Sequence, residues 1–179
     1  LFSYPDIVEI QKKLCFDIKN ANDVLSDFSK EVFGFGTFRE FPRLNANLLD
    51  NPSISQREMV EASLRDESFL TILPTGGGKS ICFQLPALVL AGTTIVISPL
   101  IALMKDQVDS LKANGIDACF INSSQSSDEQ QLHIQNLKDN KVKLVYVAPE
   151  SLSFLENAFS QITVSLIAID EAHCISAWG

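Results

Sequence analysis

The sequence predicts an α/β fold in which a mainly parallel sheet carries helices on both faces. Apolar, β-branched segments of strand length alternate with segments of helical periodicity along most of the chain. A glycine-rich turn stands between one of these strands and the helix that follows it. Apolar residues make up 46% of the 179 residues and charged residues 20%, a composition typical of a globular domain with a sizeable core.

The N-terminal part differs from the rest of the chain. Residues 5–32 have apolar positions at helical spacing, whereas glycines and prolines interrupt residues 33–51 and predict a loop-rich connector. We therefore expect an N-terminal helical segment of unassigned role at residues 1–32 and one domain at residues 33–179.

After the connector, helices and strands alternate. The expected helices span residues 53–65, 80–90, 102–113 and 128–138. The expected strands span residues 69–73, 93–98, 117–121, 143–147 and 165–169. In such a sheet, ligands bind beyond the carboxyl ends of the strands, which is where the motifs described next are found.

The segment Pro74–Ser80 (P-T-G-G-G-K-S) joins an expected strand to an expected helix. Consecutive glycines let backbone N–H groups turn toward phosphate oxygens, and the helix N-terminus favours an anion. Lysine and serine after such a loop bind the β- and γ-phosphates and Mg²⁺, although the strict pattern has glycine where this chain has Leu73. We expect ATP and Mg²⁺ as cofactors, held by Thr75, Gly76, Gly77, Gly78, Lys79 and Ser80.

A second motif, Asp170-Glu171-Ala172-His173, follows the expected strand at residues 165–169. A carboxylate at such a strand end can hold Mg²⁺, usually through water, together with the P-loop serine. The next carboxylate is suited to orient and deprotonate the water that attacks the γ-phosphate. Asp170 and Ser80 are thus the expected metal ligands and Glu171 the expected base; the alternative is a solvated strand end without chemistry.

Charge and cysteine content restrict the partners and the location that we expect. A net charge of −8 weighs against a nucleic-acid partner, but a local basic stripe can coexist with an acidic remainder. Four widely spaced cysteines indicate reduced, packed thiols and a cytoplasmic or nucleoid location. The apolar stretches are too short to cross a bilayer and residues 1–10 lack a signal-peptide pattern, so we expect no membrane partner.

The acidic motif continues as C-I-S-A-W-G, residues 174–179, and the whole string resembles a motif of RecQ-family DNA helicases. DEAH alone is shared with many RNA helicases, whereas C-I-S-x-W-G is not. The resemblance extends over residues 33–179 and implies a RecA-like P-loop NTPase lobe. It also implies that His173 is a catalytic residue that couples nucleotide to DNA. Trp178 would belong to a loop that senses single strands, and its alternative role is core packing.

Two further segments resemble family motifs that contact the nucleic-acid backbone, namely V-I-S-P-L-I-A-L-M-K-D-Q at residues 96–107 and Y-V-A-P-E-S-L at residues 146–152. The family usually has Thr where this chain has Ala148, so the resemblance implies that one hydroxyl contact to phosphate is missing. For Lys105 the alternative is a solvated helix position. Besides Trp178, the implied DNA-binding residues are Ser98, Pro99, Lys105, Pro149 and Glu150.

Residues 33–39 (F-G-F-G-T-F-R) resemble the family's opening motif, in which an aromatic and an Arg sandwich adenine and a Gln reads its edge. Phe35 and Arg39 fit the first two roles. The Gln usually follows the Arg by three residues, but here Gln56 stands at the family's usual distance before the P-loop lysine, after an insertion of about 14 residues. A capping box with Ser53 is a rival role for Gln56, whereas a capping box of Ser55 with Glu58 would leave it free.

These motifs together predict the ATP-binding motor lobe of a RecQ-like 3′–5′ DNA helicase that couples ATP hydrolysis to single-strand translocation and duplex unwinding. The expected partners are single-stranded and partly duplex DNA and a second RecA-like lobe of the same polypeptide; a start without Met and an end just after a motif are typical of a piece of a longer chain. One alternative is a DNA- or RNA-stimulated ATPase or translocase without unwinding. The other is a non-catalytic, nucleotide-gated interaction module.

Overall fold

The computed structural model describes residues 21–43, 53–65 and 68–177. The chain divides into two compact units, Leu1–Val89 and Leu90–Gly179. Each unit is described by itself below.

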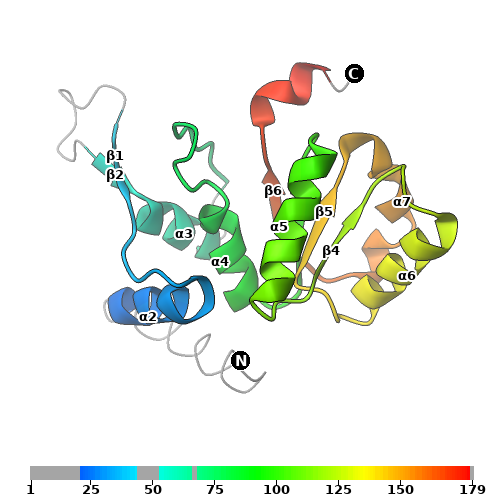
Figure 1. Cartoon of the computed structure of the whole chain (residues 1–179), viewed down its shortest axis with the longest axis horizontal. Coiled ribbons are helices and arrows are strands. Elements are labelled where there is room, and N and C mark those ends of the chain that lie inside the picture. The colour runs from blue at the N-terminus through cyan, green and yellow to red at the C-terminus, as the bar shows by residue number, and fades with distance from the viewer. Residues whose placement is uncertain (1–20, 44–52, 66–67, 178–179) are drawn as a thin grey trace. The chain divides into compact units, whose positions relative to one another are not determined.

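The second unit is built on a four-stranded parallel sheet with the strand order β4-β5-β3-β6 (Figure 1). The strands are short and rich in apolar residues, as expected for strands covered on both faces. Their bounds are Thr93–Ile97 for β3, Ala118–Ile121 for β4, Leu144–Val147 for β5 and Val164–Ile169 for β6. They confirm four of the five expected strands.

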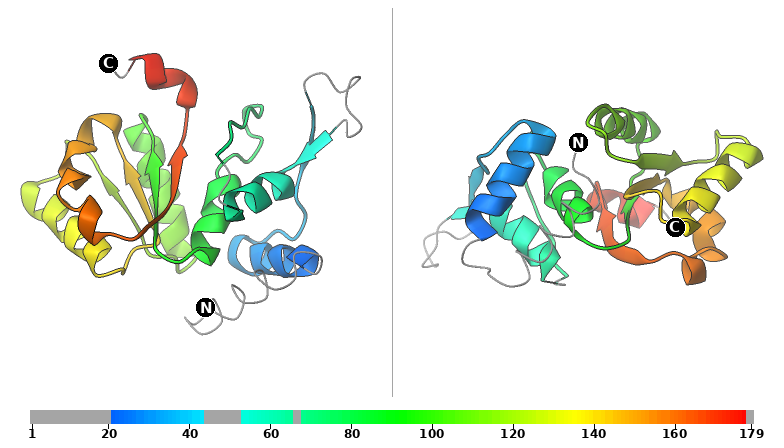
Figure 2. Two further views of the ribbon diagram at one scale, coloured as in Figure 1. Left: turned by 180° about the vertical axis from the view of Figure 1, so that it is seen from behind. Right: turned by 90° about the horizontal axis from the view of Figure 1, so that it is seen from below.

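Helix α5 (Ile101–Ala113) covers one face of this sheet, and α6 (Ser127–Lys138) and α7 (Ser153–Glu156) cover the other (Figure 2). Side chains alternate between the two faces of a strand, so the inner strands β5 and β3 supply both layers of core, whereas Ile167 and Ile169 of the edge strand β6 are exposed. The layer beneath α6 and α7 is one buried cluster, whose members include Ile95, Cys119, Ile121, Leu137, Val145, Val147 and Leu155. The predicted α/β class, with a parallel sheet covered on both faces, is confirmed.

Three short 3-10 turns complete the second unit. Their bounds are Pro149–Ser151 for η2, Phe159–Gln161 for η3 and Ala172–Ala177 for η4. Two of them, η2 and η4, come directly after the carboxyl ends of β5 and β6. The chain therefore turns sharply at the sheet edge that carries the predicted motifs.

The core beneath α6 provides a test of the fold. We expect Leu137→Ala to lower the free energy of unfolding by about 2–5 kcal/mol, because Leu137 is fully buried and its truncation leaves a cavity. The matched control is Leu132→Ala on the same helix, where the side chain is 59% exposed and a change within about 0.5 kcal/mol is expected. Urea unfolding of both variants measures the difference, and equal effects would contradict the described core.

The first unit contains α2 (Ala21–Phe33), a hairpin of β1 (Glu40–Pro42) with β2 (Ser53–Ser55), and two packed helices, α3 (Gln56–Leu64) and α4 (Ile81–Val89). The two helices meet through Met59, Ser63 and Cys82. The Cys82 thiol lies 3.6 Å from the Met59 sulfur, and the Ser63 hydroxyl donates to the Cys82 carbonyl at 3.3 Å. Nearly every residue of α4 is buried, which explains its apolar sequence.

Three expectations for the first unit are wrong. No strand forms at residues 69–73, where Leu70 and Ile72 are about three-quarters exposed. A strand requires a hydrogen-bonded neighbour, and the described strands of this unit pair only with each other. The helix expected from residue 53 begins at Gln56, because residues 53–55 form β2. The connector expected to be loop contains β1.

Two of the cysteines, Cys82 and Cys119, are buried. Burial raises the pKa values of Cys82 and Cys119 to about 12, so both remain thiols at neutral pH. Their interpretation as packed apolar groups is confirmed for this pair. Within the described ranges, none of the helices has both the length and the apolar character that a membrane span would need.

Candidate functional site

The P-loop has the backbone that its glycines were expected to provide. Gly76 and Gly78 both have φ of +72°, a conformation that other residues rarely adopt. The N–H of Gly77 donates to the Pro74 carbonyl at 2.9 Å and closes a tight turn. A Cβ on Gly77 would lie 2.8 Å from that carbonyl oxygen, so the turn has no room for a side chain. The loop then leads through Lys79 and Ser80 into α4.

Arg39 and Gln56 hold the carbonyl side of this loop. The Arg39 guanidinium donates through Nη1 to the Gly76 carbonyl at 2.7 Å. The buried Gln56 amide donates through Nε2 to the carbonyls of Gly77 at 3.0 Å and Gly78 at 3.1 Å. Two side chains thus bind the carbonyls of three successive glycines.

The insertion between Arg39 and Gln56 closes on itself as a hairpin. Strands β1 and β2 pair in antiparallel register from Glu40↔Ser55 to Pro42↔Ser53. At the base of this hairpin, the Gln56 N–H donates to the Arg39 carbonyl at 2.9 Å and the Arg39 N–H donates to Gln56 Oε1 at 2.8 Å. Two residues that are separated by the insertion in sequence are therefore adjacent in space.

The helix cap leaves Gln56 available for this position. The hydroxyl of Ser55 accepts the N–H of Glu58 at 3.2 Å, and the Glu58 carboxylate accepts the Ser55 N–H at 3.1 Å. This reciprocal pair is the capping box of α3. The rival role for Gln56, a capping box with Ser53, is wrong.

The aromatic residues of the opening motif have other neighbours. The ring of Phe35, the expected adenine stack, is half-buried with its centroid 6.2 Å from that of Phe33. The ring of Phe38 makes a cation–π contact, since the Arg57 guanidinium lies 5.6 Å from its centroid. Adenine binding by Phe35, Arg39 and Gln56 remains a prediction.

In the second unit, the acidic motif stands at the end of β6. The Asp170 N–H donates to the Ile97 carbonyl at 2.9 Å and continues the ladder with β3. The Asp170 carboxylate accepts the N–H of Glu171 at 3.0 Å. Glu171 has φ of +51°, a left-handed conformation that costs about 1–3 kcal/mol for such a residue and is concentrated at functional sites.

The fourth residue of this motif, His173, lies beside the expected base. Its Nδ1 is 3.3 Å from Glu171 Oε2, while most of its ring is exposed. The carboxylate is thus placed to pair with the ring when the histidine is protonated. The structure thus brings Asp170, Glu171 and His173 together at one strand end.

The expected backbone-contacting residues occupy neighbouring strand ends. Ser98 follows β3 and donates its N–H to the Val147 carbonyl at 3.1 Å, which brings it next to Ala148 at the end of β5. Pro99 follows Ser98, and Pro149 and Glu150 begin η2. Lys105 is exposed on α5, and Trp178 lies outside the described residues.

Buried polar atoms without hydrogen-bond partners gather at this same edge. They include the Ser98 hydroxyl, the Ser151 hydroxyl in η2 and Nδ2 of Asn122, which follows β4. These three residues are at most 1% exposed. An unpaired buried polar group is costly, and such atoms in folded proteins are commonly satisfied by a buried water. Ser151 and Asn122 were not among the expected site residues. The available signal was their position shortly after expected strands.

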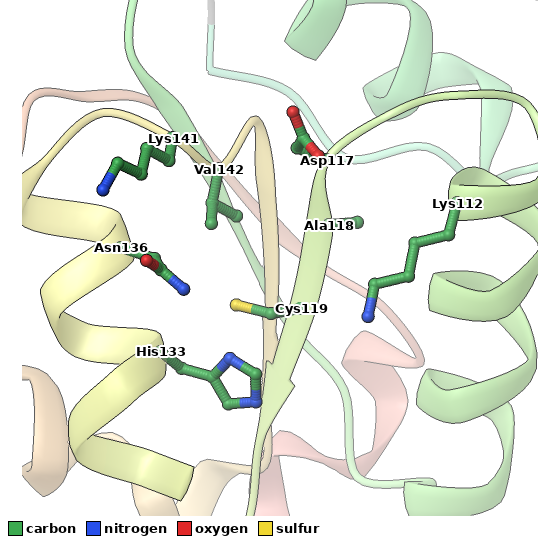
Figure 3. Close-up of a pocket in the computed structure, with 8 residues that line it drawn as sticks. All are labelled: Lys112, Asp117, Ala118, Cys119, His133, Asn136, Lys141 and Val142. Atoms are coloured by element: carbon green, nitrogen blue, oxygen red, sulfur yellow. The ribbon is translucent and has the colours of Figure 1, made fainter.

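A pocket of about 410 Å³ lies elsewhere in the second unit, beside the edge strand β4. His133 and Asn136 on α6 point toward Cys119 from one side, and Lys112 of α5 lies on the other (Figure 3). Burial, assisted by the Lys112 charge, lowers the pKa of His133. His133 is half-buried. None of the expected site residues lines this pocket.

The chain is similar to known proteins over most of its length. Residues 53–179 match the family described as DEAD/DEAH box helicase. The ATP-dependent DNA helicase RecQ of Haemophilus influenzae is 47% identical over 154 residues, which are 84% of this chain and 22% of that protein. The protein of the same name from Bacillus subtilis is 58% identical over 110 residues, 60% of this chain and 19% of that protein. The chain therefore spans about a fifth of the length of these relatives.

Proposed function

Because the chain belongs to the DEAD/DEAH box helicase family, we propose that it is the ATP-binding motor lobe of a RecQ-like 3′–5′ DNA helicase. The single observation that carries the proposal furthest is the P-loop, where Gly76 and Gly78 have positive φ and Gly77 has no room for a side chain. Such a loop fits phosphate groups, which bind to backbone N–H groups at close range. The similarity to proteins named RecQ supports DNA as the polymer.

The nucleotide chemistry is assigned residue by residue. Lys79 neutralises the β- and γ-phosphates, and Thr75 with the three glycines surrounds them. Ser80 and, through water, Asp170 would hold Mg²⁺, which neutralises charge on the phosphates when bound. Glu171 orients the attacking water and accepts its proton. Phe35, Arg39 and Gln56 would bind adenine. The Gln56 amide would then give up a hydrogen bond to a P-loop carbonyl and form one with the edge of the base.

DNA contact is assigned to the carboxyl edge of the sheet. The resemblance assigns Ser98 to the DNA backbone. The hydroxyls of Ser98 and Ser151 are buried in this structure, so a phosphate oxygen would reach them only after this edge opened. Ser151 stands three residues after Ala148. It has a hydroxyl group, whereas Ala148 lacks the hydroxyl of the Thr that the family usually has at that position. Pro99, Pro149 and Glu150 shape this edge, Lys105 adds charge, and Trp178 stacks on a base. His173 links this edge to the nucleotide through Glu171.

The test is the ATPase and unwinding activity of a protein in which this chain is joined to a second RecA-like lobe. We expect single-stranded DNA to stimulate ATP hydrolysis and RNA to stimulate it much less. A partly duplex DNA with a 3′ overhang should be unwound, and one with a 5′ overhang should not. Stimulation by DNA without unwinding would indicate a translocase, and nucleotide binding without turnover would indicate a gated interaction module.

A further inference from the structure

The aromatic ring of Phe41, on strand β1, lies against the P-loop. A Cβ placed on Gly77 would be 3.5 Å from Cε1 of Phe41, an ordinary van der Waals contact. The same Cβ would be 3.4 Å from the Leu73 Cβ and within 2.8 Å of the Pro74 carbonyl oxygen. The ring of Phe41 therefore forms one wall of the space around Gly77, which is buried.

The hairpin directs this ring inward. Along β1, Glu40 and Pro42 are exposed and Phe41 between them is half-buried, the alternation expected of a strand with one covered face. Phe41 pairs with Ile54 across the hairpin. The contact with Gly77 thus depends on the register of β1 and β2, in the segment inserted between Arg39 and Gln56.

We propose that Phe41 is a positioning residue of the nucleotide site, through which the inserted hairpin holds the P-loop ready for phosphate. The inference rests on the proposed function and deepens it. Arg39 and Gln56, at the base of the hairpin, bind the carbonyls of Gly76, Gly77 and Gly78, and the Phe41 ring borders the space beside the central glycine. Three residues from one hairpin thereby fix three successive glycines.

The physical reason lies in the freedom of the glycines. Glycine loses more conformational entropy on ordering than any other residue, so a loop with three of them binds weakly unless its conformation is fixed beforehand. Contacts made before the ligand arrives reduce that cost and raise affinity. Removing the Phe41 ring leaves the hydrogen bonds in place but opens space beside Gly77, and the loop samples more conformations.

The experiment measures binding of a fluorescent ATP analogue to the 179-residue chain, together with thermal unfolding. We expect Phe41→Ala and Phe41→Val to raise the dissociation constant about tenfold, because the loop must then be ordered on binding. Phe41→Leu, which keeps an apolar wall, should bind within about twofold of the unchanged chain. Valine suits a strand and keeps the test possible if the alanine variant does not fold.

Phe154→Ala is the matched control, because it removes an identical ring that is 40% exposed on α7 and lies outside the hairpin and the P-loop. Its affinity should stay within about twofold of the unchanged chain. Equal affinity of the Phe41→Val variant and the unchanged chain would overturn the inference, and so would an equal loss in Phe154→Ala. Absence of nucleotide binding by a protein in which this chain is joined to a second RecA-like lobe would contradict the proposed function instead.

Discussion

The 179-residue chain alone should hydrolyse ATP about 10³–10⁵-fold more slowly than a protein in which it is joined to a second motor lobe, and it should bind nucleotide weakly. This is the contribution of an arginine finger in related phosphoryl-transfer systems. The resemblance to RecQ-family helicases implies that the finger belongs to the other lobe. Steady-state ATPase assays of both proteins with saturating single-stranded DNA measure the ratio.

The arginines of this chain explain why it cannot supply its own finger. All four lie in the first unit and are engaged there: Arg39 binds the Gly76 carbonyl, Arg43 pairs with Glu58, and Arg57 and Arg65 both pair with Glu61. The second unit contains lysines but no arginine. Without a guanidinium, the charge that develops on the γ-phosphate during transfer lacks its strongest ligand.

The control for this comparison is Lys79→Ala in both proteins, which defines the background from contaminating ATPases. A rate for the chain alone that approaches the rate of the longer protein, and that disappears in Lys79→Ala, would contradict the prediction. It would mean that another group in this chain stabilises the transferred phosphoryl group.

The strands that sequence periodicity predicted well are those that pair within one sheet. The segments that became β3, β4, β5 and β6 are mostly apolar. Strand β5 is buried along its whole length, whereas Ile167 and Ile169 of the edge strand β6 are exposed. Residues 69–73 have a similarly apolar sequence, yet no strand forms there. Apolar content predicts burial, whereas a strand also needs a neighbour in register, and a single segment does not specify its neighbour.

The site was predictable where residue type alone decides the chemistry. The glycine-rich loop, its lysine and serine, and the acidic pair after a strand are recognisable from spacing. The hairpin β1–β2 was not, because its strands have three residues each and include Pro42, which argues against a strand. The left-handed backbone of Glu171 and the unpaired Ser151 hydroxyl arise only from tertiary structure.

Glu171→Gln should lower the DNA-stimulated ATPase rate of the longer protein by about 10²–10⁴-fold, the usual contribution of general acid–base catalysis. Glutamine keeps the size of the side chain, but it cannot accept the proton of the attacking water. The left-handed backbone at this position is no harder for glutamine than for glutamate. Nucleotide affinity should therefore be retained while turnover is lost.

That separation of binding from turnover identifies the role of Glu171. Lys79→Ala should weaken nucleotide binding itself, since it removes the cation that neutralises the phosphates. Glu156→Gln is the matched control, an exposed glutamate on α7, and should leave both binding and rate unchanged. If Glu171→Gln binds ATP normally and still turns over at the full rate, Glu171 is not the base. Its strained backbone would then serve only to place Asp170 and His173, and the proton acceptor would have to be another group.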